Sequence, residues 1–104
     1  MTLQDDARQR LRDAAWLIGQ PGCWCQGSIA KDIRGAHIGG LNPNAVSWCG
    51  WGAVVAISKL DGLPPYAAAD LFYAHHDDLL QVINDRVDMT ARKMARLMLE
   101  AADG

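Results

Sequence analysis

Apolar residues recur every three or four positions near the start of the chain, which is typical of an amphipathic helix. The stripe consists of Leu3, Ala7, Leu11, Ala14, Ala15 and Ile18. The remaining positions are mostly polar with both signs of charge, and Gly19 and Pro21 then interrupt the pattern. The sequence therefore predicts a first helix over about residues 3–18, with Thr2 as a weak cap.

A second helical pattern follows Asn42 and Pro43. This pair favours a helix start, because Asn accepts hydrogen bonds from free amides and Pro suits the first helical position. The segment is apolar over much of its surface, as expected for a buried helix. Its apolar residues are Val46, Trp48, Cys49, Trp51, Ala53, Val54, Val55 and Ile57. We therefore expect a central buried helix over about residues 43–60, in which Gly50 and Gly52 let a neighbouring helix approach closely.

Two shorter helices are expected next. Proline can begin a helix but cannot continue one, so Pro65 predicts a helix over about residues 65–74, with Leu63 facing inward. Asp77 then has the side chain to cap a short apolar helix that ends at Asn84.

The terminal segment is the clearest helix after the first one. Thr90 predicts its cap, and Met94 and Met98 belong to a stripe repeated every three or four residues.

Between the first two helices the pattern is weak, and we expect only a short helix over about residues 27–33. No stretch of the sequence shows the alternation typical of strands for more than a few residues, so we predict an all-α fold. We expect one domain, residues 1–104, that forms a compact bundle of about four to five helices around the central helix.

Composition and charge limit the kinds of partner that we expect for this chain. Half of the residues are hydrophobic, and ten Lys and Arg against twelve Asp and Glu give a net charge of -2, which offers no long-range attraction to nucleic acid. The most apolar stretch, residues 50–57, is far shorter than the roughly 20 residues of a membrane span. With no secretion signal and three cysteines, we expect a cytoplasmic protein with free thiols and no membrane contact.

The cysteines and histidines leave two chemical alternatives open. A zinc site could combine Cys23, Cys25, Cys49 and His75, although one residue separates the first two cysteines where structural sites have two to four. A cysteine hydrolase or thiol-redox enzyme would need a thiol beside an imidazole of His75 or His76, and no spacing selects such a pair. Phosphate-loop, dinucleotide, HExxH and GxSxG motifs are absent from the sequence. We therefore predict no catalytic residues, no resident metal and no cofactor.

Tryptophan is the other unusual feature. Trp16, Trp24, Trp48 and Trp51 are dense for a chain of 104 residues, and we expect them to cluster as the segment around Trp24 docks on the central helix. An exposed subset would instead anchor a partner. Polar residues beside short turns form the candidate binding site. They are Trp24, Gln26, Lys31, Asp32, Asn84 and Asp85. The alternative is that Gln26, Asn84 and Asp85 cap helix ends and tie turns together.

Three motifs carry a resemblance to a known family. They are Gly-Cys-Trp-Cys-Gln-Gly at residues 22–27, Ala-Val-Ser-Trp-Cys-Gly-Trp-Gly-Ala at residues 45–53, and Ile-Asn-Asp at residues 83–85 before Thr90. The chain resembles, over residues 14 to about 101, an uncharacterised family of short bacterial and phage proteins with a domain of unknown function. It departs at Ile83, where the family has Trp, and at Trp51, where a smaller aliphatic residue is usual. The resemblance implies the fold and a bacterial or phage origin, and it transfers no catalytic residue.

The sequence thus favours a small noncatalytic binding module that contacts a protein or small ligand. A narrower hypothesis is a phage-type inhibitor of a host defence complex, for which the support is size and resemblance. The competing class is the small cysteine enzyme or zinc-binding domain. The sequence leaves open whether the chain assembles with copies of itself.

Overall fold

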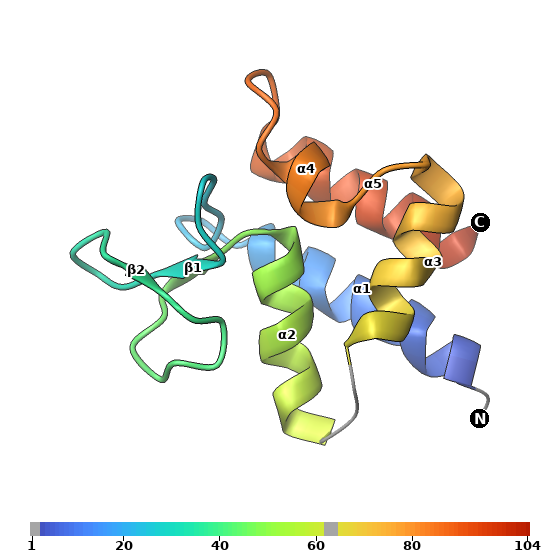
Figure 1. Cartoon of the computed structure of the whole chain (residues 1–104), viewed down its shortest axis with the longest axis horizontal. Helices are drawn as coiled ribbons and strands as arrows, with labels where there is room; N and C mark the ends of the chain where they lie inside the picture. Colours follow the sequence, from blue (N-terminus) through green and yellow to red (C-terminus); the bar gives the residue numbers. More distant parts are fainter. Residues whose placement is uncertain (1–2, 62–64) are drawn as a thin grey trace.

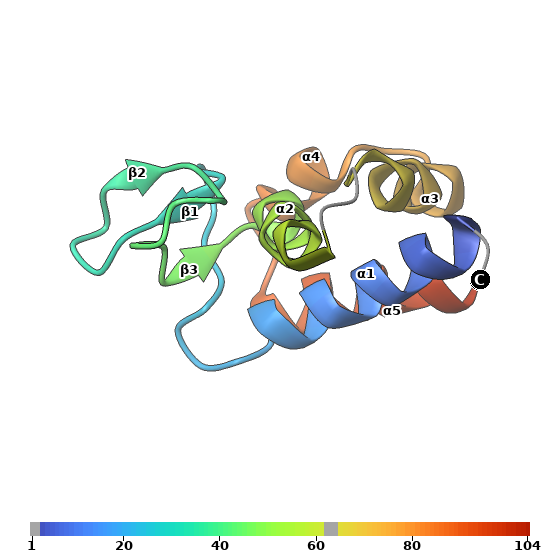
Figure 2. The same cartoon turned by 90° about the horizontal axis from the view of Figure 1, so that it is seen from below.

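The computed structural model describes residues 3–61 and 65–104. Five helices and three short strands lie within these ranges. Their order is α1 (Leu3–Ile18), β1 (Ala30–Lys31), β2 (His37–Ile38), β3 (Ser47–Trp48), α2 (Gly50–Asp61), α3 (Tyr66–His76), α4 (Leu80–Asn84) and α5 (Ala91–Asp103). The helices form a body in two layers, with α1 and α5 on one side and α2, α3 and α4 on the other (Figures 1 and 2). The strands lie in a small lobe, residues 27–49, that projects from this body (Figure 1).

The first helix has the predicted bounds and supplies a long buried stripe. Its buried residues include Leu11 and Ile18, separated by alanines that allow close packing. α5 lies along α1 and buries Met94 and Met98 in the same core. Burial of each such large side chain contributes about 1.5–3 kcal/mol, so the α1 and α5 pair accounts for much of the core.

The second helix begins later than predicted. α2 starts at Gly50, and the residues before it form a turn and then β3. The reason is that the Asn42 side chain accepts a hydrogen bond from the N–H of Asn44 at 2.9 Å, which closes a turn, and the N–H of Val46 then donates to the carbonyl of Lys31 at 2.9 Å. α2 still contacts each of the other four helices.

The lobe corrects the all-α expectation. Its three-stranded antiparallel sheet has the order β2-β1-β3, and Ala30 lies opposite both Ile38 and Trp48. The predicted short helix over residues 27–33 is therefore wrong, because β1 occupies part of this range. The fold is mainly helical with a small sheet.

Of two helix caps predicted from the sequence, the structure confirms the one at Thr90 and contradicts the one at Asp77. Thr90 caps α5 by accepting the N–H of Lys93 at 3.2 Å, as predicted. Asp77 does not cap α4: it ends α3 in the left-handed conformation, with φ of 58°, and its N–H donates to the carbonyl of Tyr73 at 2.7 Å. The cap predicted at Thr2 and the core position predicted at Leu63 lie outside the described residues.

Within residues 3–61 and 65–104, no helix combines the length and the apolar character needed to cross a membrane.

Candidate functional site

Asn84, the last residue of α4, lies at the centre of the predicted binding residues. Its side chain is completely buried. Its Oδ1 accepts the indole N–H of Trp24 at 2.7 Å and the N–H of Gly50 at 2.9 Å. Its Nδ2 donates to the carbonyl of Cys25 at 3.0 Å and to Oδ1 of Asp85 at 3.1 Å. Both lone pairs and both N–H groups of the carboxamide are therefore used inside the protein.

Gln26 and Asp85 extend this network to the surface. Nε2 of Gln26 donates to the carbonyls of Asn84 and Arg86, at 2.9 and 2.8 Å. Oδ1 of Asp85 accepts the N–H of Gly27 at 3.0 Å. Trp24, Gln26, Asn84 and Asp85, which we call the Asn84 cluster, thus bind the start of the lobe to the end of α4. Their arrangement is that of a structural brace.

Lys31 and Asp32 lie elsewhere in the lobe. Lys31 belongs to β1, where it pairs with His37 and Ser47. Oδ1 of Asp32 accepts the N–H groups of Arg34 and Ala36, both at 2.9 Å, and so holds the turn between β1 and β2. In the described part of the chain, no hydrogen bond joins these two side chains to the Asn84 cluster. The six predicted residues therefore form one network of four and a separate strand and turn.

Two of the three cysteines, Cys25 and Cys49, are buried, and burial raises the pKa of both thiols. Burial raises the pKa of the Cys49 thiol, and hydrogen bonds from the N–H groups of Gly52 and Trp51 lower it in part. Burial also raises the pKa of the Cys25 thiol, against a lowering by a hydrogen bond with Ser47. A raised pKa keeps a thiol protonated at neutral pH, the opposite of what an activated nucleophile requires.

His75 does not join the cysteines. It lies at the end of α3, with its ring 4.7 Å from that of His76. Among residues 3–61 and 65–104, the group of potential metal ligands that comes together is His75, His76 and Glu100. The alternative zinc set of Cys23, Cys25, Cys49 and His75 is thus not assembled.

The tryptophans are divided among three environments. Trp24 and Trp48 are half-buried on adjacent backbone segments, since the N–H of Trp48 donates to the carbonyl of Cys23 at 2.9 Å. Trp51 packs against Tyr66 with ring centroids 5.9 Å apart. Trp16 remains 66% exposed on α1 and does not join a single cluster with the others. The Trp24 segment docks on β3, whereas the sequence predicted docking on a helix.

The sequence interpretation missed a hollow in the lobe. A cavity of about 530 Å³ is lined by Asp32, Ile33, Arg34, Pro43, Asn44 and Val46. Ile33 is 86% exposed there. The sequence contains a signal for an exposed apolar residue here, because Ile33 is an aliphatic residue between two charged residues in a segment rich in glycine. Glu100 was also missed, since nothing in the local pattern relates it to the histidines.

No protein-family model, curated protein or solved structure matches this chain.

Proposed function

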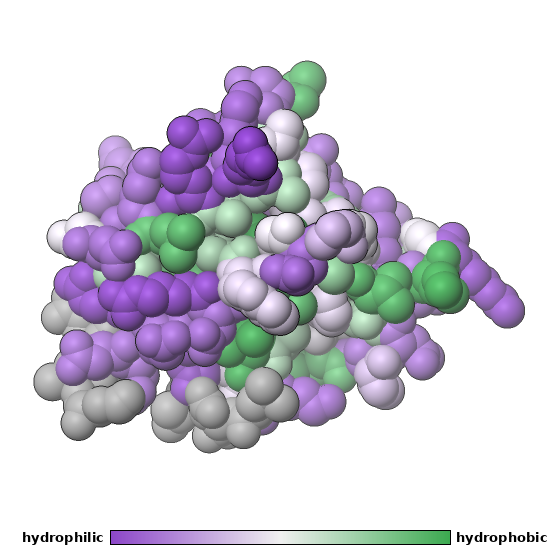
Figure 3. Space-filling view, turned by 180° about the vertical axis from the view of Figure 1, so that it is seen from behind, coloured by the Kyte–Doolittle hydropathy of each residue, from purple (hydrophilic) through white to green (hydrophobic). Residues whose placement is uncertain are grey.

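We propose that this protein is a noncatalytic interaction module that binds another protein through its lobe. The observation that carries the proposal is the exposure of aliphatic side chains on this small projecting unit. Ile29, Ile33, Leu41 and Val46 are 45%, 86%, 52% and 43% exposed. Figure 3, in which the lobe lies at the right, shows hydrophobic residues spread along it. Ile33 and Val46 line the same cavity, and adjacent exposed apolar residues are typical of interaction sites.

Hydrogen bonds within the chain hold the turns of the lobe. Asp32 fixes one turn by accepting two backbone N–H groups, and Asn42 fixes the other by accepting the N–H of Asn44. Nζ of Lys59 on α2 donates to the carbonyl of Leu41 at 3.3 Å, which holds this loop beside the body. A preorganised surface loses less conformational entropy on binding, so these contacts favour recognition by the lobe.

The chemistry of the cavity favours a protein side chain over a polar small ligand. Oδ1 of Asp32 is already occupied by the N–H groups of Arg34 and Ala36. Ile33, Pro43 and Val46 contribute apolar surface to the same cavity. Such a surface suits an apolar anchor from a partner, surrounded by polar residues.

The proposal is tested by site-specific photo-crosslinking in cells of the source organism. A photoreactive phenylalanine analogue is placed at Ile33, at Val46, or at Leu99, an exposed aliphatic residue on α5 that serves as the matched control. We expect one adduct of the same mass from both lobe positions and none from Leu99. Equal adducts from Leu99, or no adduct from either lobe position, would refute the proposal.

The identity of the cross-linked protein separates the narrower hypotheses. A component of a defence complex would support the phage-type inhibitor that the resemblance suggests. A second copy of this chain would instead indicate a homo-oligomer. Cys25 and Cys49 are not favoured as nucleophiles of a cysteine enzyme, because burial raises the pKa of both thiols.

A further inference from the structure

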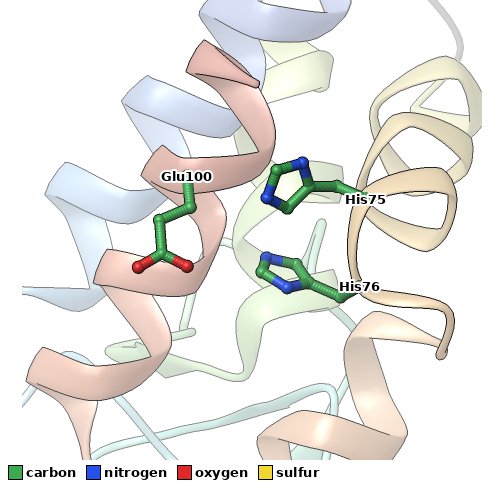
Figure 4. Close-up of side chains that lie close together, drawn as sticks. All are labelled: His75, His76 and Glu100. Carbon is green, nitrogen blue, oxygen red and sulfur yellow. The ribbon is translucent and has the colours of Figure 1, made fainter.

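Three side chains with metal-binding atoms meet at the end of the body remote from the lobe. His75 and His76 lie in the last turn of α3, and Glu100 lies in the last turns of α5. One ligand atom from each lies within 4.8 Å of the other two. Figure 4 shows both imidazole rings reaching from α3 toward α5, on the side where the carboxylate of Glu100 lies. The group therefore spans two helices that are distant in sequence.

Contacts hold the two imidazoles near these positions. The rings of His75 and His76 are at 80° to each other, so they meet edge to face and do not stack. Nε2 of His76 lies 2.6 Å from the carbonyl of Leu97 on α5. The ring of His75 lies against Gly104, where a Cβ atom would collide with it. A metal site needs such positioned ligands, and these contacts supply part of that support.

The surroundings of these three side chains carry charges of both signs. α3 and α5 both end here, and helix C-termini carry partial negative charge from unpaired carbonyls. The last turn of α5 contains no basic residue. Three basic residues oppose this charge. Arg8 lines a cavity with His75 and donates to the carbonyl of Ala102, which offsets part of the negative end of α5. Lys93 and Arg96 line another cavity with Glu100. The carboxylate of Glu100 supplies a full negative charge.

We propose that His75, His76 and Glu100 bind one divalent transition-metal ion of the zinc type. Two imidazole nitrogens and one carboxylate oxygen form a donor set that suits zinc and disfavours magnesium or calcium, which prefer oxygen ligands. His75 and Glu100 are exposed, so a hydrated ion can reach the site and water completes its coordination. The site bridges α3 and α5 and does not depend on the function of the lobe.

Small side-chain movements complete the geometry. Zinc lies about 2.0–2.1 Å from imidazole nitrogen, so the ligand atoms must move closer together than their present separation of up to 4.8 Å. The side chain of Glu100 is exposed, so its carboxylate can move toward the two imidazoles. Binding through Nε2 of His76 exchanges its hydrogen bond with Leu97 for a metal bond, whereas binding through Nδ1 retains that bond.

The test measures binding of zinc chloride to the full chain, first stripped with chelator and then freed of it, by calorimetry and thermal unfolding. We expect one ion per chain and a rise in Tm of at least about 4 °C at saturation, because an ion that binds only the folded state stabilises it. His75→Ala and Glu100→Gln should each weaken binding at least about tenfold. Both side chains are exposed, so these variants should fold.

Two control variants separate this site from other zinc ligands. His37→Ala removes the third histidine, which lies on β2, and Cys23→Ser removes the most accessible thiol. Both should bind zinc like the unsubstituted chain. Cobalt should give ligand-field absorption without a thiolate charge-transfer band. The proposal is overturned if zinc does not bind, if His75→Ala and Glu100→Gln bind it unchanged, or if Cys23→Ser abolishes binding.

Discussion

The indole N–H of Trp24 donates to Oδ1 of Asn84 over 2.7 Å, although the two residues are 60 positions apart in the sequence. The same Oδ1 accepts the N–H of Gly50, the first residue of α2. One buried carboxamide therefore joins the entry to the lobe, the start of α2 and the end of α4. This brace fixes the position of the lobe, through which we propose that the protein binds its partner.

Replacing this carboxamide should be among the most destabilising single changes. Asn84→Ala leaves the N–H of Gly50, the indole of Trp24 and the carbonyl of Cys25 without their partner in a buried site. Each buried group that loses its partner costs about 1–3 kcal/mol, so we expect a loss of about 3 kcal/mol in the free energy of unfolding, measured with urea. Asn44→Ala, at an exposed position, should change it by less than about 0.5 kcal/mol. Similar losses in the two variants would contradict the role of the brace.

The thiols should differ in reactivity according to burial. Cys25 and Cys49 are buried and their pKa values are raised by burial, whereas Cys23 is partly exposed. At pH 7 we expect a maleimide to modify Cys23 first and the other two only after denaturation, as peptide mass spectrometry would show. Fast modification of Cys49 in the native protein would contradict this expectation and would support the hypothesis of a cysteine enzyme.

The same raised pKa values predict a loss of stability at alkaline pH. In the unfolded chain a thiol titrates at about pH 8.5–9, below its pKa in the folded protein. The unfolded state therefore releases protons first, so the stabilisation is complete below about pH 8.5 and is lost as the pH rises through the folded-state pKa. Urea unfolding from pH 7 to 10 should show this decline, and Cys49→Ala should reduce it. An equal decline in Cys49→Ala would assign it to other groups.

Hydrophobic stripes and capping residues in the sequence predicted the helices whose ends depend on contacts between residues close in sequence. The stripe containing Leu11 and Ile18 gave α1 its correct bounds, and Thr90 caps α5 as expected. Asn42 misled the prediction because the same side chain can cap a helix or close a turn, and here it closes a turn. The sheet was missed because two-residue strands have no periodicity and depend on pairing between distant segments.

The candidate site was predicted by residue type but not by arrangement. Trp24, Gln26, Asn84 and Asp85 do come together, but the sequence could not tell whether their polar atoms face one another or a ligand. That depends on contacts such as the one between Gln26 and the carbonyl of Asn84, 58 positions away. The exposed lobe and the cluster around Glu100 arise from the same non-local packing.

The cap of α5 offers a test of a contact that the sequence alone predicted. Thr90→Ala removes the acceptor for the N–H of Lys93, and loss of such a cap typically costs about 1 kcal/mol. Thr90→Ser keeps the hydroxyl and should retain most of the stability. Equal losses in the two variants, measured by thermal unfolding, would mean that packing of the Thr90 methyl group matters more than the hydrogen bond.

The docking of the lobe on α2 depends on the absence of a side chain at Gly52. A Cβ atom there would collide with the backbone carbonyl of Ile29, which cannot move without displacing the strand that follows it. Gly52→Ala should therefore destabilise the protein by about 2 kcal/mol or more, and it should also weaken cross-linking from Ile33 because the lobe shifts. Gly39→Ala is the matched control: nothing lies within 4 Å of its added Cβ, so the variant should be neutral or slightly stabilised. Thermal unfolding compares the two, and a Gly52→Ala variant as stable as Gly39→Ala would show that the lobe is not held against α2 by this close contact.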